Sequence, residues 1–180
     1  GDLGPEAYRF VDFLQESGQH LWQTLPLGPT GGHNSPYQCF SSFAGQPLLI
    51  SPELLKDEGL LTDADLSNVP HFSDEEVDFA AVGEYKKELF KKAFARFKEL
   101  PEDNPLKSEL ALFCKSAHWL DDYAMFMAIK KSKGGAHWLD GRRNTANLQN
   151  LRKLLLSVSL KMRFFMRSFF SGHFAVSGAS

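Results

Sequence analysis

A helical pattern that leads within a few residues into a short apolar run is the feature that most limits how this chain can fold. Residues 5–17 place four apolar side chains at helical spacing, namely Ala7, Phe10, Val11 and Leu14. Pro5 suits the first position of that helix, and Gly18 suits its end. Residues 20–27 then predict a buried strand. A helix followed directly by a buried strand is typical of a parallel α/β protein, which is the fold class we expect.

The composition changes over residues 28–46. Gly, Pro, Ser and Asn become dense there, and the helical period disappears. A long loop directly after a strand lies at the C-terminal rim in barrel folds, where ligands bind. Long loops without secondary structure are often functional in compact domains, so this loop is the first candidate for a site.

The remainder of the chain is predicted to be mainly helical. Ser51 can cap a helix that has Pro52 at its first position. Ser73 with Glu76 has the form of a capping box and predicts the start of a long helix that Pro101 ends. We expect the core face of this helix to contain Val82, Tyr85, Leu89, Ala93 and Phe97, and its solvated face to contain Lys86, Lys87, Lys91 and Lys92.

Residues 106–131 predict one or two further helices, with Leu110, Phe113, Cys114, Ala117, Tyr123, Phe126 and Met127 inside. A break follows at Gly134-Gly135, and an amphipathic segment covers about residues 144–170.

Composition excludes several classes of function. The net charge of -2 gives no field that would favour nucleic acid or an anionic membrane. Basic residues interrupt the most apolar stretch, at 151–176, before it reaches the roughly 18 residues of a membrane span. The first residues lack both the basic and the apolar region of a secretion signal.

The cysteines and histidines predict no metal site. Cys39 and Cys114 are far apart and belong to no CxxC pair, and no two of the six histidines have the spacing of helical ligands. We expect reduced, buried thiols, although the sequence does not exclude a disulfide. Reduced thiols favour a cytoplasmic protein.

Four stretches resemble, in order and spacing, segments of the amylomaltase family, which are 4-alpha-glucanotransferases. They are residues 1–14 (GDLGPEAYRFVDFL), 21–30 (LWQTLPLGPT), 34–45 (NSPYQCFSSFAG) and 119–126 (WLDDYAMF). The resemblance covers about residues 1–140. It implies part of a (β/α)8 TIM barrel with a helical inserted subdomain, helix-rich over these residues. Residues 1–50 would be the N-terminal piece of the barrel without its first strand, residues 51–150 the inserted subdomain, and residues 151–180 a divergent helix and tail.

The resemblance also implies a chemistry. Members of the family transfer segments of α-1,4-glucan between maltooligosaccharides with retention, using one carboxylate as nucleophile and a second carboxyl group as acid. No metal or organic cofactor and no protein partner is implied. In the family those carboxylates lie beyond the last residue of this chain, so no catalytic residue is expected among its residues. Asp121 and Asp122 are adjacent on a helix and point in different directions, and Asp2 is expected in a turn or cap.

Within the NSPYQ loop, the resemblance places Tyr37 beside the sugar at the cleavage point. A phenol ring offers an apolar face to the sugar and a hydroxyl to anchor it, whereas the alternative is a Tyr that packs the loop onto the barrel. Ser35 and Pro36 would shape the loop, and Gln38 would reach toward the sugar. Trp22 is expected in the core and His33 is expected to be a plain loop residue. Many relatives carry Tyr where this chain has Gly32, which implies that an outer aromatic contact to glucan is lost.

Three hypotheses follow from the sequence. The chain is part of a glucanotransferase, a non-catalytic α-glucan-binding module, or an inactive truncated product. Because the acid-bearing strands are expected to be absent, we expect this chain to be inactive by itself. Between the other two hypotheses we favour the inactive product, because one rim loop rarely binds sugar without its partner loops.

Overall fold

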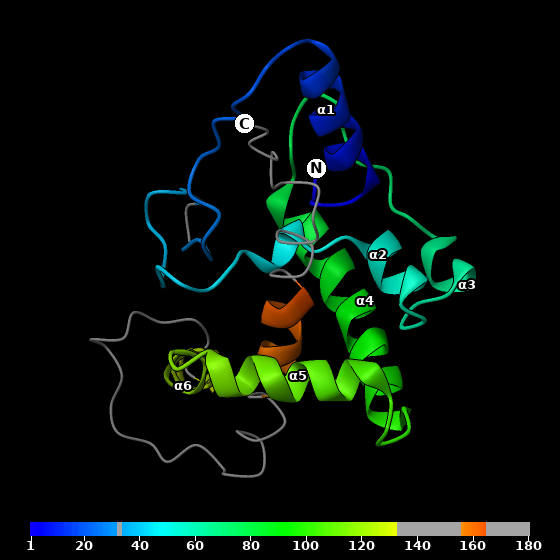
Figure 1. Cartoon of the computed structure of the whole chain (residues 1–180), viewed down its shortest axis with the longest axis vertical. Coiled ribbons are helices and arrows are strands. Elements are labelled where there is room, and N and C mark those ends of the chain that lie inside the picture. Colours follow the sequence, from blue (N-terminus) through cyan, green and yellow to red (C-terminus); the bar gives the residue numbers. More distant parts are fainter. Residues whose placement is uncertain (32–33, 133–155, 165–180) are drawn as a thin grey trace, which may run out of the picture. The chain divides into compact units, whose positions relative to one another are not determined.

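The computed structural model describes residues 1–31, 34–132 and 156–164. Among these the chain forms helices, a single isolated bridge and no strand (Figure 1). They form two compact units, one made of Gly1–Pro101 with Phe164 and the other of Glu102–Arg163. Within the described ranges no helix is both long enough and apolar enough to cross a membrane.

Helix α1 (Pro5–Glu16) begins and ends where its sequence predicts. Pro5 occupies its first turn, and Gly18 adopts a left-handed backbone with φ of 71°. The amide of Gln19 then donates to the Leu14 carbonyl at 2.9 Å, which satisfies one of the last helical acceptors. The predicted helix is confirmed, but Phe10 and Phe13 remain exposed.

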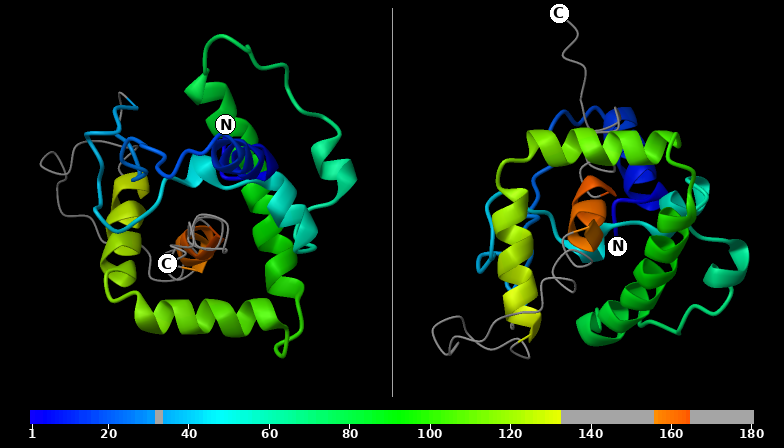
Figure 2. Two further views of the ribbon diagram at one scale, coloured as in Figure 1. Left: turned by 45° about the horizontal axis from the view of Figure 1, so that its top comes forward. Right: turned by 90° about the horizontal axis from the view of Figure 1, so that it is seen from below.

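The buried strand predicted over residues 20–27 is wrong for the described chain. These residues form neither helix nor strand, and both views of Figure 2 show them as an irregular segment that continues into the loop. Leu21 is 91% exposed, and Trp22 and Leu25 are exposed as well. A parallel strand requires neighbouring strands and helices on both faces, and the described residues provide no strand to pair with.

Helix α2 (Pro52–Asp57) packs against helix α4 (Phe79–Glu99), as does the short 3₁₀ helix η1 (Pro47–Leu49) (Figure 2). Ser51 caps α2 by accepting from the Leu54 amide, and Pro52 follows it, as predicted. The buried apolar residues of these helices and of the residues next to them are Ile50, Leu55, Leu60, Leu61, Leu89, Phe90, Ala93 and Phe97.

The predicted start of α4 is wrong by five residues. The helix begins at Phe79, and its cap is Asp78, whose carboxylate accepts from the amides of Ala80 and Ala81. Ser73 does accept from the amides of Glu75 and Glu76, at 3.1 and 3.3 Å, but the turn that it closes does not continue as helix. The helix stops at Glu99, just before Pro101, as expected.

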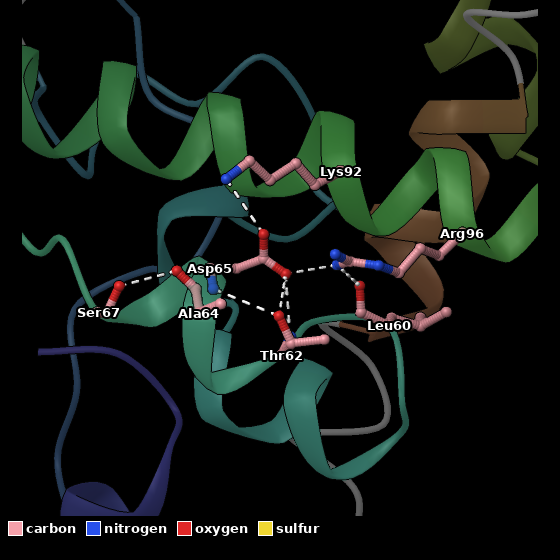
Figure 3. Close-up of polar contacts among 7 residues, drawn as sticks. All are labelled: Leu60, Thr62, Ala64, Asp65, Ser67, Lys92 and Arg96. Carbon is pink, nitrogen blue, oxygen red and sulfur yellow. Dashed lines mark hydrogen bonds and ion pairs between the residues drawn. The ribbon is translucent and has the colours of Figure 1, made fainter.

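Helix α3 (Asp63–Leu66) is fixed to α4 through Asp65 (Figure 3). Thr62 and Asp65 form a capping box, and the Asp65 carboxylate also pairs with Arg96 at 2.6 Å and with Lys92 at 3.1 Å. Arg96 donates in addition to the Leu60 carbonyl at 3.0 Å. Hydrogen bonding to Arg96, supported by Thr62 and Lys92, holds the pKa of Asp65 well below its usual range despite its burial.

The second unit contains helices α5 (Pro105–Ser116) and α6 (Leu120–Ser132) and residues 156–163 of a further helical segment. Two helices over residues 106–131 are therefore confirmed. Leu110, Ala117 and Tyr123 are buried as predicted, and burial raises the pKa of Tyr123 to about 12. Both cysteines are free, but Cys114 is exposed, so the expectation of a buried thiol is wrong there.

Only residues 156–164 of the predicted amphipathic segment at 144–170 are described, and they are helical. The predicted break at Gly134-Gly135 lies outside the described residues. The division into a barrel piece, an inserted subdomain and a divergent tail remains a prediction. The two compact units are defined by contacts within the chain, and they do not test boundaries that come from a family resemblance.

Candidate functional site

The candidate site is a loop that is closed at its neck. At the neck, the Gln46 amide donates to the Leu27 carbonyl at 2.8 Å, and its side-chain amide donates to the Thr30 hydroxyl at 2.9 Å. Further along, the Phe40 amide donates to the Pro29 carbonyl at 3.0 Å, and Thr30 and Cys39 form an antiparallel bridge. Residues 27–31 and 34–46 therefore belong to a closed loop of the kind that often carries function.

The four residues predicted from the NSPYQ motif lie together at the tip of this loop. The Gln38 amide donates to the Ser35 carbonyl at 3.1 Å, which closes a turn with Pro36 and Tyr37 in its middle. Ser35 and Pro36 are half-buried, whereas Gln38 is exposed. Tyr37 is 74% exposed, so its ring packs against little of the described chain.

Cys39 follows the same turn and bonds back to it. Its thiol donates to the Pro36 carbonyl at 2.9 Å. On the other side stands Gly28, where a Cβ atom would lie 2.9 Å from the Cys39 Sγ and 3.1 Å from the Ser41 carbonyl oxygen. Any larger residue at position 28 would therefore displace this part of the loop.

The segment that follows the loop is anchored by a buried lysine. The Lys86 ammonium donates to the Asp2 carboxylate at 2.6 Å, to the Leu48 carbonyl at 2.7 Å and to the Ile50 carbonyl at 2.9 Å. Its side chain is only 8% exposed. All three of its donors are thus used to join α4, the residues after the loop and the start of the chain.

Two sequence predictions are corrected by this arrangement. Lys86 was expected on the solvated face of α4, but it lies on the buried face. Asp2 was expected in a turn or cap, yet it pairs with Lys86, and no side chain caps α1. The sequence does contain a signal for the burial of Lys86, because its position follows the same helical repeat as Val82, Leu89 and Ala93.

The aromatic and acidic candidate residues outside the loop lie in different segments of the chain. Trp22 was expected in the core but is exposed, with its ring edge-on to Phe10 at 5.1 Å. Gly32 and His33 lie outside the described residues. Asp121 and Asp122 are exposed in the first turn of α6. Over residues 1–31, 34–132 and 156–164 no His, Cys, Asp and Glu side chains gather as metal ligands would.

A comparison with solved structures identifies the class of protein. An amylomaltase of Streptococcus agalactiae, solved in complex with acarbose, matches 95% of this chain with a TM-score of 0.83 and 33% identity. The match covers 36% of that amylomaltase. The fold of this chain therefore resembles part of the fold of that amylomaltase.

Relatives by sequence narrow the class to one family. A 4-alpha-glucanotransferase of Synechocystis is 46% identical over 77% of this chain, and one of Aquifex aeolicus is 49% identical over 74% of it. The chain spans about a quarter of the length of these relatives, 27% and 26% respectively. The family model for 4-alpha-glucanotransferase matches residues 1–171, and the chain belongs to that family.

Proposed function

We propose that this chain supplies the N-terminal part of a 4-alpha-glucanotransferase that transfers α-1,4-glucan segments between maltooligosaccharides with retention. The barrel piece would be residues 1–50, and the helical insertion would follow it. The observation that carries the proposal is a closed loop that presents Tyr37 to solvent, in a chain of this family. Acarbose bound to the related amylomaltase supports an α-glucan as the ligand.

In this proposal Tyr37 contacts the sugar at the cleavage point. Its exposed ring provides an apolar face for the C–H surface of the sugar, and its hydroxyl provides a hydrogen bond. Gln38 is exposed beside it and can reach a sugar hydroxyl, while Ser35 and Pro36 shape the turn. No nucleic acid, membrane, metal or organic cofactor enters the proposed reaction, and the free thiols support the cytoplasm as the compartment.

The proposed chemistry needs two carboxyl groups about 5–5.5 Å apart. Asp121 and Asp122 do not meet this need, because adjacent residues of one helix point in different directions. We therefore propose that the 180 residues by themselves do not transfer glucan. The alternative function is a non-catalytic module, which would bind α-glucan without transferring it.

The test of Tyr37 uses a chimera in which residues 1–132 replace the corresponding segment of the Streptococcus agalactiae amylomaltase. Tyr37→Ala removes ring and hydroxyl and is expected to lower kcat/KM for maltotriose by about tenfold to a hundredfold. Tyr37→Phe keeps the ring and is expected to lose less, and Phe43→Ala, exposed in the same loop, is the matched control. A Tyr37→Ala chimera that melts earlier but is fully active once folded would show that Tyr37 is a packing residue.

A further inference from the structure

The direction of the Tyr37 ring depends on the backbone of its turn. Because 74% of Tyr37 is exposed, side-chain packing holds it only weakly. Two hydrogen bonds bracket it instead, one from the Gln38 amide to the Ser35 carbonyl and one from the Cys39 thiol to the Pro36 carbonyl. The second bond ties the residue after the turn back to Pro36.

Cys39 is itself held from three directions. Its backbone pairs with Thr30 in the antiparallel bridge, and the next amide, that of Phe40, donates to the Pro29 carbonyl. Its Sγ is confined by Gly28, where there is no room for a Cβ atom. The thiol therefore lies between the neck of the loop and the Pro36 carbonyl. Through it, the neck restrains the turn at the tip.

We propose that Cys39 is a positioning residue that fixes Tyr37 in the orientation in which it meets the glucan. This inference rests on the proposed contact of Tyr37 with sugar. A contact residue that is already oriented loses less conformational freedom when the ligand binds, so its support affects the strength of binding. Cys39 acts through Tyr37 and does not touch the substrate.

The first experiment measures the turn directly in the 180-residue chain. Amide hydrogen exchange is followed by NMR for Gln38, whose amide closes the turn, in wild type, Cys39→Ala and Cys39→Ser. Cys39→Ala removes the donor and should speed exchange at Gln38 by about threefold to tenfold. Cys39→Ser keeps a donor and should remain within about twofold of wild type. Cys114→Ala is the control, since that thiol lies on α5.

The second experiment measures the consequence in the chimera with a double-mutant cycle. Cys39→Ala should raise KM for maltotriose by about threefold to tenfold, with less change in kcat, and Cys39→Ser should restore it. In a Tyr37→Ala background, Cys39→Ala should have no further effect on KM.

Each outcome separates this inference from the proposed function. If Tyr37→Ala leaves KM and kcat unchanged, or if a folded chimera transfers no glucan, the proposed contact with sugar fails, and the exchange experiment alone decides whether Cys39 orders the turn. If Tyr37→Ala is impaired but Cys39→Ala is not, or if the two effects are additive, the positioning role is refuted. Unchanged exchange at Gln38 in Cys39→Ala also refutes it.

Discussion

Replacement of Lys86 by Met is the sharpest test of how the residues after the loop are held. Met keeps most of the apolar stem but removes all three donors, which leaves the Asp2 carboxylate and the carbonyls of Leu48 and Ile50 without this partner. Removing one partner of a buried ion pair costs about 3–5 kcal/mol. Asp2 retains 21% exposure and can regain water, so we expect a loss of about 2–4 kcal/mol in the free energy of unfolding.

The assay is urea denaturation of the 180-residue chain followed by circular dichroism at 222 nm. With a slope of about 2 kcal/mol per molar urea, the expected loss lowers the midpoint by about 1–2 M. Lys91→Met is the matched control on the same helix, because Lys91 and its partner Glu88 are 61% and 60% exposed. Such a pair contributes about 0–1 kcal/mol, so its midpoint should stay close to that of wild type.

Two results would refute the reasoning. One is a Lys86→Met midpoint equal to that of Lys91→Met, which would show that the three hydrogen bonds add no net stability. The other is strict additivity between Lys86→Met and Asp2→Asn, because residues that share an ion pair should be coupled.

Three further predictions concern the activity of the 180-residue chain, its association, and the ion pair of Asp65. The purified 180-residue chain should produce no glucose and no longer maltooligosaccharides from maltotriose, and either product above a buffer control would contradict this. Its exposed apolar surface, which includes Leu21 and Phe13, should make it associate at high concentration in size-exclusion chromatography, and a monomer at every concentration would be the contrary result. Asp65→Asn should cost about 1–3 kcal/mol at pH 7. Since the folded pKa of Asp65 is depressed, that difference should be present above its unfolded pKa of about 4 and should shrink as the pH falls below it, whereas a pH-independent difference would remove the ion pair as its cause.

The helix ends that were predictable from the sequence depend on local chemistry. Pro5 and Gly18 bound α1, and Ser51 with Pro52 opens α2, because caps and breakers act within one turn of the backbone. Ser73 shows the limit of this logic. Its hydroxyl accepts two amides as a cap does, but residues 74–78 provide no buried apolar stripe to continue the helix, and Asp78 caps it instead.

The features that were missed depend on partners distant in sequence. Residues 20–27 have the composition of a buried strand, but a strand forms only against other strands. Lys86 lies on the helical repeat of α4, yet a lysine there is expected to face solvent unless Asp2 and the two carbonyls are known to meet it. Composition identifies the loop, and the resemblance identifies Tyr37, but neither shows the thiol that closes the turn.

The bonds that shape the candidate loop are independent of the strand that was expected to precede it. The neck is closed between Leu27 and Gln46, the tip between Ser35 and Cys39, and the exit is held by Lys86. None of these bonds uses residues 20–26, which remain exposed and irregular. The hydrogen bonds of the neck and of the tip join residues of the loop to one another, so they do not require a neighbouring strand. If Cys39 has the proposed positioning role, the orientation of Tyr37 depends on this turn and not on residues 20–26.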